Sequence, residues 1–205
     1  MAMTKIAILA SGGGTNLQAI IEAAEAGTLG AEVALVLSDK ASALALERAK
    51  RHNIKTALVT KKNYPARDAF DKRLIEILKE NNIDLVVLAG FMRIITKALI
   101  DAFPARIMNI HPSLLPAFPG LNVQQKAIDY GVKFSGCTVH FVDEGVDTGP
   151  VIIQAVVPVM DDDTAESLGA RILKEEHRIY PEAIRLYCRG QLLVKGRRVL
   201  IQDRG

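Results

Sequence analysis

An asparagine and a histidine stand two residues apart in residues 107–120, which read IMNIHPSLLPAFPG. The apolar residues around them predict a short strand that the prolines end. Side chains at positions i and i+2 of a strand point to the same side, so we expect Asn109 and His111 to project together. An amide N–H can stabilise a developing oxyanion, and an imidazole can donate or accept a proton near neutral pH. This pair therefore suits a reaction at a carbonyl group.

A histidine used in this way needs a carboxylate that orients it and stabilises its charged form. The candidates are Asp143, Glu144 and Asp147 in the segment VDEGVDTGP, where two glycines let the loop turn inward. Asp147 is the first choice, but all three stay open on this evidence. Metal binding is not expected, because the chain has neither an H-E-x-x-H motif nor a cluster of cysteines and histidines.

A second candidate site is the glycine-rich segment SGGGTN at residues 11–16, between an apolar run and a helical pattern that starts at Leu17. Glycines let backbone N–H groups approach a phosphate closely, and a helix N-terminus adds donors and a favourable dipole. Thr15 and Asn16 add side-chain donors. The segment therefore predicts a site for a single phosphate.

Other interpretations of this segment stay open. A P-loop needs a lysine after its last glycine, and none is present here. The dinucleotide motif G-x-G-x-x-G is matched by Gly12 and Gly14, but Leu17 stands in place of the third glycine; Asp39 could act as the ribose-binding acid. The alternatives are a nicotinamide-dependent oxidoreductase, a non-catalytic phosphometabolite-binding module and a tight turn without a ligand.

The elements that must position these residues alternate in the first half of the chain. Compact apolar runs predict strands at Ile6–Leu9, Val33–Leu37 and Leu85–Ala89. Between them, apolar residues at helical spacing form two faces: Leu17, Ile20, Ile21 and Ala24, then Phe70, Leu74, Ile77 and Leu78. This pattern predicts an α/β fold with a mostly parallel, twisted sheet and helices on both faces.

The second half differs in character. Four prolines between residues 104 and 119 predict a loop, ordered or disordered. Strands are expected at Thr138–Val142 and Val151–Val157, then a long helix over Thr164–Tyr187 that Asp163 or Thr164 caps. The residues after Gln191 predict a hairpin or a mobile end with a solvated basic turn. We expect His52 to be solvated and His140 to be structural.

The composition excludes several classes of protein. Of the 205 residues, 49% are hydrophobic and 24% charged, which supports a folded core in one domain or at most two small ones. No apolar run is long enough to span a membrane, and the start lacks a secretory signal. A net charge of +3 and an aromatic content of 5% argue against a nucleic-acid surface. The distant Cys137 and Cys188 indicate a reducing, cytoplasmic setting.

Four long segments carry a resemblance to a known family: SGGGTNLQAII, VVLAGFMRIIT, IMNIHPSLLPAFPGL and TVHFVDEGVDTGPVIIQ. In this order, and over nearly the whole chain, the sequence resembles the phosphoribosylglycinamide formyltransferases of purine biosynthesis. The resemblance implies transfer of a formyl group from 10-formyltetrahydrofolate, the co-substrate, to the amine of glycinamide ribonucleotide, without a metal. It also implies one formyltransferase domain over residues 1–205. Its Rossmann-like, phosphate-binding half covers about residues 1–100, and its folate-binding and catalytic formyltransferase half covers about residues 101–205.

The resemblance assigns three groups of site residues. The catalytic residues are Asn109, His111 and Asp147. The residues that bind the phosphate and the rest of the nucleotide are Gly14, Thr15, Asn16, Leu17, Gln18 and Glu176. The residues that bind folate are Arg67, Met92, Arg93, Ile94, Ile95, Asn109, Asp143 and Asp147.

Two relatives with the same formyl-folate core are set apart by length. Methionyl-tRNA formyltransferase has an additional C-terminal domain and lacks the GGGTN loop, and formyltetrahydrofolate deformylase has an extra N-terminal domain. We therefore expect an enzyme that acts on small molecules in the cytoplasm, as a monomer or homodimer, without a nucleic-acid or membrane partner. The expected reaction is direct attack of the amine on the formyl carbon through a tetrahedral intermediate.

Overall fold

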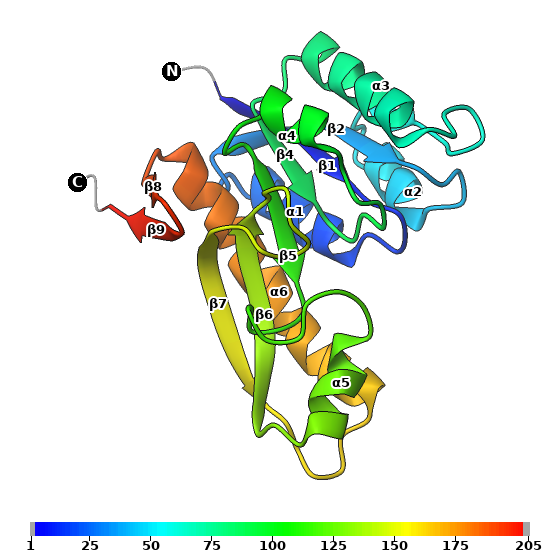
Figure 1. The fold of residues 1–205 in the computed structure, drawn as a ribbon. Helices are drawn as coiled ribbons and strands as arrows, with labels where there is room; N and C mark the ends of the chain where they lie inside the picture. Colours follow the sequence, from blue (N-terminus) through cyan, green and yellow to red (C-terminus); the bar gives the residue numbers. More distant parts are fainter. Residues whose placement is uncertain (1–2, 203–205) are drawn as a thin grey trace. The chain divides into compact units, whose positions relative to one another are not determined.

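The computed structural model describes residues 3–202 and divides the chain into two compact units, with the boundary after Met108. Figure 1 shows the order of the elements along the chain. The strand β5, Ile107–His111, contains the boundary, so its last three residues belong to the second unit.

The first unit is built on parallel strands in the order β3-β2-β1-β4. Residues 6–9 of β1 and all of β4 are buried, which explains why these strands are continuous apolar runs. The elements of this unit are β1 Thr4–Leu9, α1 Thr15–Glu25, β2 Ala31–Ser38, α2 Leu44–Arg51, β3 Thr56–Leu58, α3 Arg67–Glu80, β4 Leu85–Leu88 and α4 Lys97–Ala102.

The second unit is built on an antiparallel pair, β6 and β7, which the long helix α6 contacts. The strand β9 pairs in parallel with β7 through a single bridge, and β8 and β9 form an antiparallel hairpin. The helix α6 begins with a capping box in which Thr164 and Ser167 satisfy each other's backbone N–H groups. The elements of this unit after β5 are α5 Val123–Tyr130, β6 Phe134–Phe141, β7 Val151–Pro158, α6 Ala165–Cys188, β8 Leu192–Lys195 and β9 Arg198–Ile201.

The α/β class and the mostly parallel pairing are confirmed, as are the predicted strands, the long helix with its Thr164 cap and the C-terminal hairpin. The short elements β3, α4 and α5 were not predicted, since each is too short for its apolar residues to show a period. The predicted start of β6 is wrong: the strand begins four residues earlier, at Phe134. Glycine is uncommon in strands, so Gly136 gave no strand signal. The structure shows why it stands there: a Cβ at this position would lie 1.9 Å from the Ala155 carbonyl oxygen of β7.

Candidate active site

Four polar side chains of the second unit meet at the end of β5: Asn109, His111, His140 and Asp147. His111 Nδ1 lies 3.3 Å from Asp147 Oδ2, and Asn109 Nδ2 lies 3.2 Å from His140 Nε2. His140 Nε2 lies 3.9 Å from Asp147 Oδ1. The structure thus brings together the three residues predicted to be catalytic and adds His140 to them.

The His111 ring has an acceptor at each nitrogen. Its Nε2 lies 3.0 Å from the Phe118 carbonyl oxygen, which can only accept a hydrogen bond, so Nε2 carries a proton. Its Nδ1 faces the Asp147 carboxylate, whose Oδ2 also accepts from the Gly120 N–H at 2.9 Å. The His111 and Asp147 side chains are 6% and 12% exposed, so solvent screens this pair weakly. The arrangement suits an imidazolium ring beside a carboxylate.

His140 is in a different state from His111. Its Nδ1 donates to the Phe141 carbonyl oxygen at 2.8 Å, so its Nε2 offers a lone pair to the Asn109 amide. Burial is the largest cause that lowers the pKa of His140, and the hydrogen bond to Phe141 opposes it. The neutral His140 ring therefore fixes the Asn109 amide with its nitrogen toward β6. The sequence interpretation of His140 as structural missed this contact with a predicted catalytic residue.

The proline-containing segment after His111 is an ordered loop in the structure. Ser113 Oγ donates to the carbonyl oxygens of Ala117 and Phe118, at 2.6 and 3.2 Å. Thr138 Oγ1 donates to the Ser113 carbonyl oxygen at 2.6 Å and accepts from the Leu115 N–H at 3.1 Å. These bonds tie the loop to β6 and place the Phe118 carbonyl against His111.

The acidic loop between β6 and β7 presents Asp147 from an uncommon backbone conformation. Asp147 has φ +56°, a left-handed value that aspartate tolerates better than most residues. Asp143 Oδ1 accepts from the Gly145 N–H at 3.2 Å and from Thr148 Oγ1 at 2.6 Å, so this carboxylate shapes the loop. From the hairpin turn, Arg197 Nη2 donates to the Thr148 carbonyl oxygen at 2.8 Å. Of the three candidate acids, Asp147 is the one that faces His111.

The glycine loop of the first unit leads from β1 into α1. Gly14 is the N-cap of α1 with φ +70°, and the first turn contains no acidic residue. A Cβ on Gly14 would lie 2.9 Å from the Ala45 Cα, so α2 packs directly against the loop. The predicted binding residue Leu17 is fully buried, and the Gln18 side chain donates to Glu22 of the same helix and accepts from Arg48 of α2. The loop thus offers its backbone N–H groups and the side chains of Thr15 and Asn16, and the predicted contacts of Leu17 and Gln18 stay a prediction.

The predicted folate residues of the first unit occupy the segment after β4 and the start of α3. Met92 and Ile94 are 62% and 58% exposed, so this segment presents apolar side chains at its surface. The Met92 N–H donates to Ser11 Oγ at 2.9 Å, which links this segment to the glycine loop. The Arg93 guanidinium stacks 3.8 Å from the centre of the Phe70 ring of α3, the helix that begins with Arg67.

The remaining predicted residue, Glu176, lies in α6 of the second unit and is 7% exposed. Burial is the largest cause that raises the pKa of the Cys137 thiol to about 12, and the charge of Glu176 adds to it; the thiol therefore stays protonated and unreactive.

His52 is not solvated as predicted: its Nδ1 lies 2.6 Å from Glu25 Oε1, and its side chain is 25% exposed.

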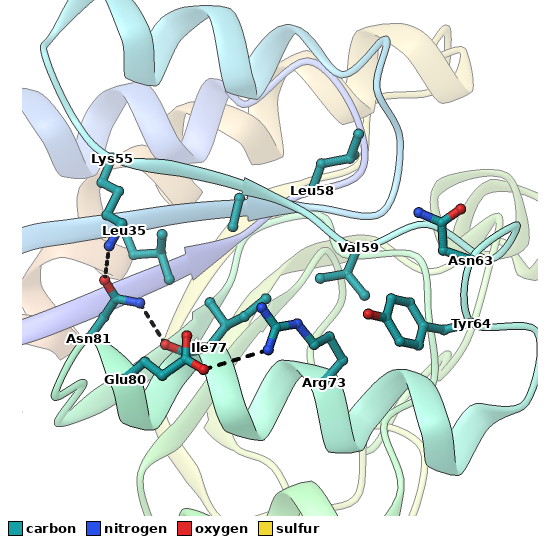
Figure 2. Close-up of a pocket in the computed structure, with 11 residues that line it drawn as sticks. Leu35, Lys55, Leu58, Val59, Asn63, Tyr64, Arg73, Ile77, Glu80 and Asn81 are labelled. Carbon is teal, nitrogen blue, oxygen red and sulfur yellow. Dashed lines mark hydrogen bonds and ion pairs between the residues drawn. The ribbon is translucent and has the colours of Figure 1, made fainter.

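A cavity of about 360 Å³ lies between β3 and α3 of the first unit (Figure 2). Lys55 Nζ donates to Asn81 Oδ1 at 2.6 Å, and Arg73 lies 3.0 and 3.6 Å from Glu76 and Glu80. None of the residues predicted for catalysis or substrate binding lines it, and its arginine already has two carboxylate partners. The cavity is therefore not a candidate for the predicted chemistry.

Within residues 3–202, no group of three or more histidines, cysteines or acids could hold a metal ion. In the same range, no helix is long and apolar enough to cross a membrane.

Comparison with known proteins gives consistent matches. The family model described as formyl transferase matches residues 4–184. The phosphoribosylglycinamide formyltransferase of Haemophilus influenzae is 44% identical, over 94% of this chain and 91% of that protein. The crystal structure of glycinamide ribonucleotide transformylase 1 from Symbiobacterium toebii has a TM-score of 0.97 and 55% identity, over 98% of this chain and 95% of that one.

A trifunctional relative is much longer than this chain. The trifunctional purine biosynthetic protein adenosine-3 of Drosophila melanogaster is 45% identical over 93% of this chain. The match spans only 14% of that protein's length.

Proposed function

This chain belongs to the formyl transferase family, and we propose that it transfers the formyl group of 10-formyltetrahydrofolate to the amine of glycinamide ribonucleotide in purine biosynthesis. The observation that carries the proposal is the cluster of the buried His111 with the half-buried Asn109 and Asp147, which suits charge development at a carbonyl oxygen. The names of the matched relatives favour this reaction over hydride transfer to a nicotinamide and over a non-catalytic binding module.

In the proposed reaction, the substrate amine attacks the formyl carbon directly. The amine nitrogen forms a bond to that carbon, the bond from the carbon to the folate nitrogen breaks, and an amine proton passes to the folate nitrogen. The carbonyl oxygen becomes negative in the tetrahedral intermediate. The Asn109 amide and the protonated His111 stabilise this oxyanion. To do so, the His111 Nε2–H exchanges its hydrogen bond to the Phe118 carbonyl oxygen for one to the oxyanion.

Asp147 holds His111 from the other side of the ring. Its carboxylate balances the charge of the imidazolium and organises water for the proton transfer to the folate nitrogen. His140 holds Asn109 through a neutral ring, so the amide meets the oxyanion with a fixed orientation. Holding the two substrates together raises the reaction rate further, since effective molarities for well-oriented reactants reach about 10⁵ M or more.

The substrates are assigned to the two remaining groups of residues. The glycine loop binds the nucleotide phosphate through backbone N–H groups and the α1 N-terminus, and Glu176 contacts the rest of the nucleotide. The exposed Met92 and Ile94 offer an apolar surface to the folate ring system, with Arg67, Arg93, Ile95 and Asp143 as further folate contacts. The protein needs no metal, and we expect it to work in the cytoplasm as a monomer or homodimer.

One assay tests the reaction. The folded protein is incubated with 10-formyltetrahydrofolate and glycinamide ribonucleotide, and the absorbance change of the folate is followed. We expect turnover that requires both substrates and that falls by roughly 10²–10³ in His111→Ala. Absence of turnover in a folded sample rejects the proposed reaction, and near-normal turnover of His111→Ala rejects the role of His111.

A further inference from the structure

The glycine loop is held from one side by two groups of α2. The Ala45 N–H donates to the Gly12 carbonyl oxygen at 3.1 Å, and Arg48 Nε donates to the Gly13 carbonyl oxygen at 2.8 Å. Ala45 lies in the first turn of α2, where backbone N–H groups have no partner within the helix. Two consecutive carbonyl groups of the loop are thus turned toward the same helix.

The direction of these carbonyls fixes the direction of the amides that share their peptide planes. In a planar trans peptide, the N–H group points opposite to the C=O group. The peptide with the Gly12 carbonyl carries the Gly13 N–H, and the peptide with the Gly13 carbonyl carries the Gly14 N–H. Both N–H groups therefore point away from α2, as donors to an anion must.

Arg48 is itself fixed by its neighbours. It is half-buried, and its Nη1 donates to Gln18 Oε1 at 3.3 Å. Gln18 Nε2 in turn lies 3.3 Å from His52 Nε2, whose Nδ1 lies 2.6 Å from Glu25 Oε1. A planar guanidinium with two donors on two elements is held more firmly than a single ammonium group would be.

Charge adds to this geometry. The loop and the first turn of α1, residues 11–18, read SGGGTNLQ and carry no charged side chain. Arg48 therefore brings a formal positive charge to a segment that has none of its own.

We propose that Arg48 is a positioning residue for the nucleotide phosphate: it turns the Gly13–Gly14 peptide so that its N–H faces the phosphate and places a positive charge behind the loop. This inference rests on the proposed function, because it assumes that the glycine loop binds the phosphate of glycinamide ribonucleotide. It also gives Gln18 a supporting role instead of direct contact with the substrate.

The test compares Arg48→Met and Arg48→Lys with Arg51→Met, a matched loss of charge at the exposed end of the same helix. In Arg48→Met, the KM for glycinamide ribonucleotide should rise roughly 10- to 100-fold, as expected for loss of a charge-assisted hydrogen bond. The kcat at saturation and the KM for the folate should stay near the wild-type values, which a merely structural defect would not allow. Arg48→Lys keeps the charge but loses the two-donor geometry, so its KM should rise about threefold or more.

Binding of ribose 5-phosphate, measured by titration calorimetry, gives a readout that needs no catalysis. The wild type and Arg51→Met should bind it equally, and both Arg48 variants should bind it more weakly. If Arg48→Met does not fold, Arg48→Lys alone decides. Wild-type affinity of a folded Arg48 variant overturns the positioning role. Absence of formyl transfer by a wild type that binds ribose 5-phosphate overturns the proposed function instead, so the two failures are distinguishable.

Discussion

Replacing Asp147 by asparagine removes a charge from the candidate active site while keeping the shape of the side chain. Asp147 Oδ2 lies 3.3 Å from His111 Nδ1, and at an effective dielectric constant near 20 the attraction of an ion pair at this distance is about 5 kcal/mol. The asparagine oxygen can still accept from the Gly120 N–H, which holds the loop, and its dipole recovers part of the attraction. We therefore expect a net loss of about 3–4 kcal/mol in transition-state stabilisation, or roughly 10²–10³ in kcat.

The assay is the folate absorbance change at saturating concentrations of both substrates, with the KM values measured in parallel. Glu144→Gln is the comparison variant, because it removes one negative charge from an exposed position of the same loop. Its kcat should stay within about fivefold of the wild type, as for other exposed charges. An Asp147→Asn enzyme that keeps the wild-type kcat, or a Glu144→Gln enzyme that loses as much, would refute the assignment of Asp147.

Three further variants test other parts of the structure. Asn16→Ala should raise the KM for glycinamide ribonucleotide and leave folate affinity largely unchanged in binding titrations; the opposite result would mean that the two sites are reversed. Gly14→Ala should lower the free energy of urea unfolding by at least about 1–2 kcal/mol, because its φ is +70° and its Cβ would lie 2.9 Å from Ala45; unchanged stability would contradict this packing. His140→Gln should flatten the pH dependence of unfolding. The pKa of His140 is lowered in the folded protein, so below about pH 6.5 the unfolded chain binds more protons than the folded one. The contribution of His140 to wild-type stability is therefore present above that pH and lost as the pH falls. An equal pH dependence of the two proteins in urea titrations would reject a neutral buried ring.

Residues with a local signal could be predicted from the sequence. The buried strands β1 and β4 are short apolar runs, and Thr164 stands before an amphipathic stretch, so local rules suffice for both. Asn109 and His111 could be paired because a strand has a period of two. The choice of Asp147 among three acids could not be made locally, since it depends on the left-handed backbone of Asp147 and on the bond from Gly120.

The contacts of Arg48 and His52 also lie beyond local rules. Both are charged or polar residues near the end of α2, where a solvated position is the usual outcome. Their partners Gly13 and Glu25 are 35 and 27 positions away, so only the packing of α1 and α2 brings them together. A signal was nevertheless present in Gly14, because a glycine at a helix N-cap without a side-chain cap allows a neighbouring helix to approach closely.

The two histidines of the candidate active site show why residue type alone cannot assign a role. His140 is buried between a carbonyl oxygen and the Asn109 amide, so one of its nitrogens must donate and the other must accept, and only the neutral ring does both. His111 Nε2 meets the Phe118 carbonyl oxygen and its Nδ1 lies 3.3 Å from the Asp147 carboxylate, so both of its nitrogens face acceptors. In the proposed reaction, the neutral His140 ring orients the Asn109 amide while a protonated His111 meets the developing oxyanion. The strand pattern predicted one of these residues as catalytic and the other as structural, whereas the structure places both in contact with Asp147 and the Asn109 amide in contact with His140.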